Sequence, residues 1–265
     1  MSERAGLSVE QIGCLFDLGG RVAVVTGAGG ALGGALARGL AAYGADVVVT
    51  DLALSSLESA VTDIEFLGRR SLPLACDVTD EAGVRSMIDA AIAEMGSVDI
   101  LITAAGISNR YSAEDFPAAE WDRVMSVNVR GTFLCCQAAG RHMIERGSGK
   151  IITIGSVRGF VGSPSGNTGY GVSKGAVHIL TKQLATEWAR HRINVNGIAP
   201  AVFRTPLTRD VLENPVTSGW LLSRIPWGRN AEAEDFIGAA VYLASPASDF
   251  VTGVILSVDG GSVAG

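Results

Sequence analysis

Tyr170 and Lys174 carry side chains that can exchange a proton, and Lys174 follows Tyr170 by four residues. On a helix this spacing places both side chains on one face. A phenol with a pKa of about 10 is mostly protonated at neutral pH, and a nearby ammonium favours its ionised form. The pair therefore suits proton transfer to or from a substrate oxygen. Such pairs are also common on exposed helices, so this one needs support from other residues.

Two further polar residues are candidates for the same site. Ser156 directly follows a predicted strand, where its hydroxyl can hydrogen-bond a substrate oxygen and hold it near the tyrosine. Asn128 lies within a long predicted helix. Ser156 could instead simply end its strand, and Asn128 could be a buried amide satisfied by backbone groups. Their joint occurrence with the tyrosine and the lysine favours a catalytic site.

A glycine-rich turn, residues 26–33, connects the first predicted strand to the first predicted helix. Glycines such as Gly27 and Gly30 permit a tight turn, and free N–H groups at the helix start can bind a pyrophosphate. A flexible loop is the alternative for the turn alone. Its place between a strand and a helix, with an acidic residue about 20 positions later, favours dinucleotide binding.

That acidic residue is Asp51, which follows the second predicted strand. Its carboxylate can accept hydrogen bonds from the adenosine ribose and would repel a 2′-phosphate. No Arg or Lys follows in residues 52–54, so we predict NAD rather than NADP. Asp77 and Val78, at the end of the third strand, are placed to meet the adenine edge. Asp51 and Asp77 could each alternatively cap a helix.

A sheet must bring these residues together. From Arg21 onward, short β-branched apolar runs alternate with amphipathic segments of helix length. Strands that are apolar throughout are buried on both faces, and strict alternation with helices requires parallel pairing. We therefore predict an α/β fold, a doubly wound parallel sheet of Rossmann type, in which ligands bind beyond the carboxyl ends of the strands. The expected strands are 22–26, 46–50, 71–76, 100–104, 150–155, 193–199 and 254–258, and the expected helices are 32–43, 54–68, 81–95, 118–145, 171–190 and 232–243.

Composition narrows the class of protein. The chain has 265 residues, 48% of them hydrophobic, which suits one catalytic domain, 17–265, preceded by an arm, 1–16. A net charge of −6 without a basic stripe argues against nucleic acid. Without a signal peptide or an apolar stretch of membrane-spanning length, we expect a cytoplasmic protein with no membrane partner. The four cysteines are predicted to be buried thiols, with exposure left open for Cys14, and His142, His178 and His191 are given structural or surface roles. None of them has metal-ligand spacing, so no metal is predicted.

These residues resemble the motifs of the short-chain dehydrogenase/reductase family over residues 16–261. The resemblance implies that Asn128 fixes a water that relays protons from Lys174, and that Lys174 binds the nicotinamide ribose. It also implies a homotetramer, for which the apolar positions of 118–145 and 171–190 give independent support. We thus predict an NAD-dependent oxidoreductase that moves a hydride between the nicotinamide and a secondary alcohol or ketone. By resemblance, the cofactor also contacts Leu32, Ala104, Gly106, Phe203 and Thr205; the remaining matches are 127–129, 170–174, 196–200 and 258–261.

Four departures from the family pattern concern the geometry of the site rather than its chemistry. One residue is added between Ser156 and Tyr170, and we expect the loop 159–169 to absorb it. The other departures are Ala31 for the second glycine of the turn, Thr103 and Ala104 for two asparagines, and Ala201 for a glycine. We expect the Thr103 hydroxyl to bridge neighbouring strands.

The substrate is predicted from the subgroup. The chain looks most like gluconate 5-dehydrogenase and related sugar-acid or polyol dehydrogenases, which implies a small polyhydroxylated substrate. Residues 203–228 form an insertion that we expect to act as a lid. Two alternatives stay open, a 3-oxoacyl thioester reductase and a non-catalytic nucleotide-sensing protein on the same fold. Candidate substrate contacts are Arg158, Arg204 and Asn109, while Trp220 and Trp227 are expected to pack within the lid.

Overall fold

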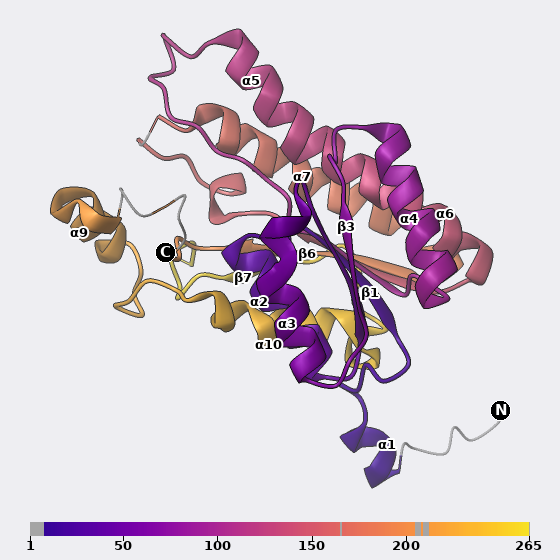
Figure 1. Cartoon of the computed structure of the whole chain (residues 1–265). Coiled ribbons are helices and arrows are strands. Elements are labelled where there is room, and N and C mark those ends of the chain that lie inside the picture. Colours follow the sequence, from indigo (N-terminus) through magenta and orange to yellow (C-terminus); the bar gives the residue numbers. More distant parts are fainter. Residues whose placement is uncertain (1–7, 165, 205–207, 209–211, 265) are drawn as a thin grey trace.

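The computed structural model describes residues 8–164, 166–204, 208 and 212–264. Seven parallel strands form one sheet in the order β3-β2-β1-β4-β5-β6-β7 (Figure 1). The order reverses between β1 and β4, so a crevice forms there at the carboxyl ends of the strands. The predicted fold class is confirmed. The strands are β1 (Val22–Thr26), β2 (Asp46–Asp51), β3 (Ser71–Ala75), β4 (Ile100–Thr103), β5 (Gly149–Ile154), β6 (Ile193–Pro200) and β7 (Ile255–Val258).

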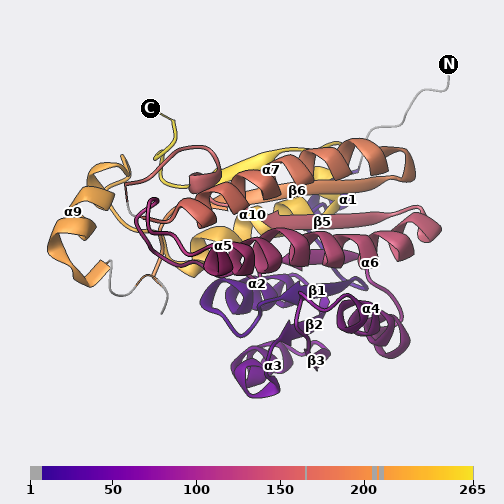
Figure 2. The ribbon, with the colours of Figure 1, turned by 90° about the horizontal axis from the view of Figure 1, so that it is seen from above.

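Helices cover both faces of the sheet (Figure 2). In β1, Ala23 and Val25 belong to one buried apolar cluster, and Val22 and Val24 belong to another on the opposite face. This two-sided burial explains why the central strands are apolar at every position. One face carries α2 (Ala31–Ala42), α3 (Glu58–Phe66) and α10 (Ile237–Ala244), and the other carries α4 (Glu81–Met95), α6 (Thr132–Arg146) and α7 (Thr168–Trp188).

Several predicted helices are interrupted. The segment expected as one helix over 118–145 consists of α5 (Ala118–Met125), a π-helical turn η2 (Ser126–Gly131) and α6. A π turn contains an extra residue and often occurs at functional sites. The 3₁₀ turns are η1 (Leu54–Leu57), η3 (Val157–Gly159), η4 (Ala189–His191), η5 (Ala233–Phe236) and η6 (Pro246–Ser248).

Two short helices were not expected. α1 (Val9–Gly13) lies in the predicted arm and starts with a capping box formed by Ser8 and Gln11, but none of its residues is buried. α9 (Pro215–Ser223) lies in the predicted lid. In Figure 1 they project from opposite ends of the molecule, with α9 near the chain's C-terminus. Among the described residues, no helix is both long and apolar enough to span a membrane.

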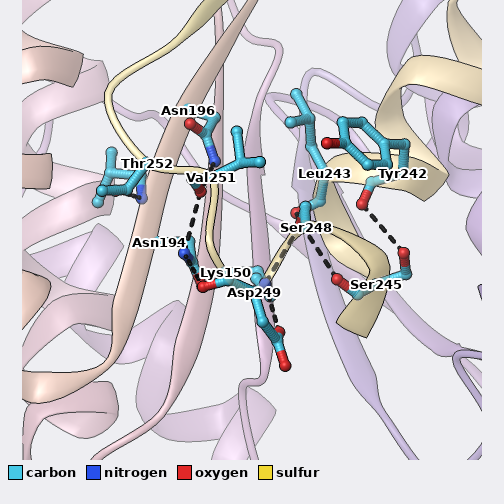
Figure 3. Close-up of polar contacts among 11 residues, drawn as sticks. Lys150, Asn194, Asn196, Tyr242, Leu243, Ser245, Ser248, Asp249, Val251 and Thr252 are labelled. Atoms are coloured by element: carbon cyan, nitrogen blue, oxygen red, sulfur yellow. Dashed lines mark hydrogen bonds and ion pairs between the residues drawn. The ribbon is translucent and has the colours of Figure 1, made fainter. Parts of the chain in front are cut away.

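A polar cluster at the amino ends of β5 and β6 holds the segment that leads into β7 (Figure 3). The Asn196 amide donates to the carbonyl of Val251 at 2.8 Å and accepts from the N–H of Val254 at 3.1 Å. Lys150 Nζ lies 2.8 Å from a carboxylate oxygen of Asp249. Asn196 is the first residue of the motif 196–200 that contributes to the family resemblance. Its hydrogen bonds hold the backbone beside the sheet, and it is not part of the crevice.

Candidate active site

The glycine-rich turn enters the crevice between β1 and α2. Gly27 has a φ of +68°, and a Cβ atom there would lie 2.7 Å from Cα of Ala105. A Cβ atom on Gly33 would overlap the carbonyl of Gly27. Both positions therefore require glycine. Ala31, by contrast, is an exposed first residue of α2, so its methyl group does not disturb the packing of this helix against the strand.

Asp51 joins the end of β2 to this turn. One carboxylate oxygen accepts from the Gly29 N–H at 3.0 Å, and the other accepts from the Leu52 N–H at 2.8 Å. The helix-cap alternative is wrong, because Ala53 is the N-cap of η1. A carboxylate has about four lone-pair sites, so Asp51 keeps acceptors for ribose hydroxyls. The turn and this acid fit a dinucleotide.

Asp77 and Val78 lie at the carboxyl end of β3. Asp77 accepts from the backbone N–H and the hydroxyl of Thr79, whereas Asp80 caps α4. The capping alternative is therefore also wrong for Asp77. Val78 is buried against Gly131 of η2, where a Cβ atom would lie 2.7 Å from a Val78 methyl group.

Asn128 is fully buried within the π turn η2. Its amide oxygen accepts from the Ile107 N–H at 2.8 Å, and its amide nitrogen donates to the Ile107 carbonyl at 2.9 Å and to Ser173 Oγ at 3.0 Å. Backbone groups thus satisfy much of this amide, as the structural alternative predicts. Asn128 nevertheless lies close to Lys174, with Gly106 against both side chains. A Cβ atom on Gly106 would lie 3.3 Å from Asn128 Oδ1 and 3.6 Å from Lys174 Nζ.

Lys174 and Tyr170 share one face of α7, as predicted. Lys174 Nζ lies 5.7 Å from the centre of the Tyr170 ring and donates to the carbonyl of Ile154, at the end of β5, at 2.7 Å. The lysine is 5% exposed, and burial lowers its pKa to about 8. Its ammonium therefore releases a proton much more readily than an exposed lysine does.

Ser156 is held from two sides. Its Oγ accepts from the Arg158 N–H at 3.1 Å, and its own N–H donates to His178 Nε2 at 3.4 Å. Burial raises the pKa of Tyr170, while a hydrogen bond with Ser156 and the charge of Arg158 oppose that rise. Arg158 thus favours the phenolate, a role that the sequence analysis assigned only to Lys174.

His178 has the structural role that was predicted for it, but its place beside Ser156 was not expected. Its ring packs beneath the loop that follows β5, where it accepts from the Ser156 N–H. Cβ atoms on Gly155 or Gly159 would overlap this ring. Burial lowers the pKa of His178 to about 4, so the ring is a neutral acceptor. The available signal was its spacing, one helical turn after Lys174.

Replacing Gly159 with alanine is expected to destabilise the protein and to impair turnover together. The new methyl group must displace the His178 ring, which supports Ser156. We expect the free energy of unfolding to fall by about 1–3 kcal/mol, as in other overpacked cores, with a lower kcat. Gly238→Ala is the control, because nothing lies within 4 Å of a Cβ atom there. Denaturant unfolding and steady-state rates would check this, and a Gly159→Ala protein matching the wild type would contradict it.

The departures from the family pattern have different outcomes. Thr103 Oγ1 is buried without a hydrogen-bond partner among the described residues, so the predicted bridge between strands is wrong. The Ala201 N–H donates to the Val258 carbonyl at 3.2 Å, which extends the ladder between β6 and β7. In the longer loop before Tyr170, the Gly166 carbonyl accepts from the Tyr111 N–H at 2.8 Å. This contact anchors the loop on the segment after β4.

The remaining predicted cofactor residues contribute mainly to packing. Leu32 and Ala104 are partly buried against the cluster that contains β1, and the Phe203 ring lies 5.1 Å from that of Phe236. Thr205 lies outside the described residues. Trp227 is 73% exposed, so its predicted packing within the lid is wrong, because its indole points to solvent.

Among the three candidate substrate contacts, only Arg158 acts on Tyr170. Arg204 is 71% exposed and ion-paired with Glu232 at 3.7 Å. The Asn109 amide donates to Glu120 Oε2 at 2.9 Å. In the part of the chain that the structure describes, no group of three or more His, Cys, Asp or Glu residues could hold a metal ion.

Comparison with known proteins places this geometry among relatives. A family model described as enoyl-(acyl carrier protein) reductase matches residues 27–262. Gluconate 5-dehydrogenase of Gluconobacter oxydans is 44% identical over 93% of this chain and 96% of its own length. Galactitol 2-dehydrogenase (L-tagatose-forming) of Cereibacter sphaeroides is 39% identical over 93% and 96%. The crystal structure of a gluconate 5-dehydrogenase from Burkholderia cenocepacia, in complex with NADP and tartrate, has a TM-score of 0.91 and 41% identity over 95% of this chain and 98% of that chain.

Proposed function

Because the chain belongs to the short-chain dehydrogenase/reductase family of oxidoreductases, we propose that it interconverts a secondary alcohol and a ketone on a sugar acid or a polyol. The observation that carries the proposal is the meeting of Ser156, Tyr170 and Lys174 at the end of β5, with Asn128 beside the lysine. The relatives named for gluconate and galactitol support this substrate class.

The chain's own residues divide the proton chemistry. A nicotinamide cofactor, when bound, supplies or accepts the hydride. Tyr170 takes the proton of the substrate hydroxyl during oxidation and returns it during reduction. The Ser156 Oγ accepts from the Arg158 N–H, and its O–H, which hydrogen-bonds Tyr170 in this structure, turns to the substrate oxygen when substrate lies between the two side chains.

Lys174 and Asn128 complete this proposed relay. With a pKa of about 8, Lys174 can pass on the proton that Tyr170 has taken. Asn128 uses both ends of its amide on Ile107. Its two amide N–H groups are used on Ile107 and Ser173, whereas Oδ1 accepts one hydrogen bond and keeps a second lone pair near Lys174 that can accept from a relay water.

We propose NAD as the preferred cofactor. Asp51 supports this choice, since its carboxylate would repel a 2′-phosphate. NADP is the alternative, because the Burkholderia structure contains it.

The two reaction directions are expected to show opposite pH dependence. The Tyr170–Lys174 pair loses its first proton near pH 8, the pKa of the buried lysine, because burial raises the pKa of the tyrosine. Alcohol oxidation needs the deprotonated pair, so kcat/KM should rise as the pH rises through about 8. Ketone reduction needs the proton, so kcat/KM should fall through the same pH. Profiles of the two directions that bend at unrelated pH values would contradict the shared pair.

A substrate panel tests the proposed function. D-gluconate, galactitol and a 3-oxoacyl thioester are each supplied with NAD and NADP, in the oxidised or reduced form that the substrate requires, and turnover is followed at the NADH absorbance. Turnover of the hydroxylated substrates supports the proposal. Reduction of the thioester alone would establish the alternative of a 3-oxoacyl thioester reductase. No turnover of any substrate would favour the non-catalytic nucleotide-sensing protein.

We propose a cytoplasmic homotetramer with a catalytic domain, 17–265, an arm, 1–16, and a lid, 203–228. Apolar side chains exposed on α6 and α7, including Phe133 and Ile179, support burial against another subunit. Light scattering coupled to size-exclusion chromatography should give four times the chain mass, and a monomer mass would contradict the assembly.

A further inference from the structure

Two arginines from separate parts of the chain meet on one indole ring. Arg158 lies in η3 after β5, and its Cζ is 6.0 Å from the centre of the Trp220 ring. Arg224 directly follows α9, and its Cζ is 5.5 Å from the same ring. The indole of the lid helix thus brings both guanidinium groups to one place.

In the part of the chain that the structure describes, neither arginine has an acidic partner. Among the described residues, ion pairs join Arg204 to Glu232 and Arg229 to Asp235, but none joins Arg158 or Arg224 to a carboxylate. The charge of Arg224 also lowers the pKa of Arg158, although burial is the larger cause. Like charges held this close repel each other, and an anion between them would relieve that repulsion.

The pair adjoins the proton-transfer groups. The Arg158 backbone N–H donates to Ser156 Oγ, and the Arg158 charge acts on Tyr170. A small cavity lies between the arginines, and its walls include Val157, Ala201 and Leu221. One guanidinium nitrogen of Arg158 donates to the Gly162 carbonyl, which leaves further donors for a ligand.

We propose that Arg158 and Arg224 bind the carboxylate of the substrate, with Trp220 as the platform that aligns them. Arginine suits this role because its planar fork can donate two parallel hydrogen bonds to a carboxylate. The inference rests on the proposed function and narrows it: the preferred substrate is a sugar acid, and a neutral polyol of equal length binds less well.

D-gluconate and D-glucitol provide the test, because they differ only in a carboxylate and a hydroxymethyl group at one end. Arg224→Gln is expected to raise KM for D-gluconate ~10- to 100-fold, the range for a lost charge-assisted hydrogen bond, with kcat nearly unchanged. KM for D-glucitol should not change. Arg158→Gln should raise KM for D-gluconate similarly and also lower kcat, because its charge acts on Tyr170. Arg85→Gln is the control, since that arginine pairs with Glu81 on the surface of α4.

Calorimetric titration with D-gluconate separates this inference from the proposed function. Binding that weakens in Arg224→Gln and Arg158→Gln but not in Arg85→Gln supports the carboxylate site, even if the wild type does not oxidise the compound. In that case the proposed reaction fails and the site stands. Absence of D-gluconate binding to the wild type, binding that neither substitution weakens, or equal KM changes for D-gluconate and D-glucitol would each overturn the site.

Discussion

The Tyr170→Phe protein is expected to lose ~10³-fold or more of kcat, within the range attributed to a positioned general acid or base. The substitution removes only the hydroxyl that exchanges the proton, and the ring beside Lys174 remains. Binding of the reduced cofactor, followed by its fluorescence, should change little. Steady-state rates on the substrate that the panel identifies provide the measurement.

Tyr43→Phe is the matched control for this experiment. Tyr43 is exposed at the end of α2, so loss of its hydroxyl should leave kcat and stability as in the wild type. A Tyr170→Phe protein that kept more than a tenth of the wild-type kcat would show that the proton passes through another group.

Asp51→Asn should lower the cofactor preference, measured as the ratio of kcat/KM with NAD to kcat/KM with NADP, by ~100-fold. Removing the carboxylate weakens hydrogen bonds to the ribose hydroxyls, and each charge-assisted bond of this kind contributes about 1.5–3 kcal/mol, or roughly tenfold or more. It also removes the repulsion of a 2′-phosphate, so the rate with NADP should rise. Initial rates with both cofactors at a fixed substrate concentration measure the ratio.

Asp63→Asn, on the exposed side of α3, is the control for the loss of one negative charge near α2. It should leave the preference unaltered. If Asp51→Asn also keeps the wild-type ratio, Asp51 does not select the cofactor, and the NAD proposal fails independently of the proton chemistry.

The fold was predictable because its signals are local and repeated. Every strand from β1 to β7 is centred on a predicted apolar run, and no strand end differs from the predicted bound by more than one residue. The approach of Ser156 to the Tyr170–Lys174 pair was also predictable, because the residue after a parallel strand and the start of the helix that follows it lie at the same edge of the sheet. α1 and α9 escaped prediction, since short helices on the surface leave little periodic pattern.

The contacts of His178 and Trp220 were not predictable for a different reason. Each depends on two segments that are remote in sequence, and nothing in the spacing reveals which side chain fills which gap. The ring of His178 fills the space left by Gly155 and Gly159, and the Trp220 ring of α9 lies against Arg158 of η3. Tertiary packing of this kind becomes visible only when the segments are placed together.

The π turn that carries Asn128 has a consequence for how this gene can change. Its extra residue sets the rotation of α6 relative to α5, and loss of one residue there would turn the two helices by ~100° relative to each other. Either the amide would leave Ile107, or Leu134 and Cys135 of α6 would leave the core. A single-codon deletion within this turn should therefore be far more damaging than a conservative exchange of any one of its residues.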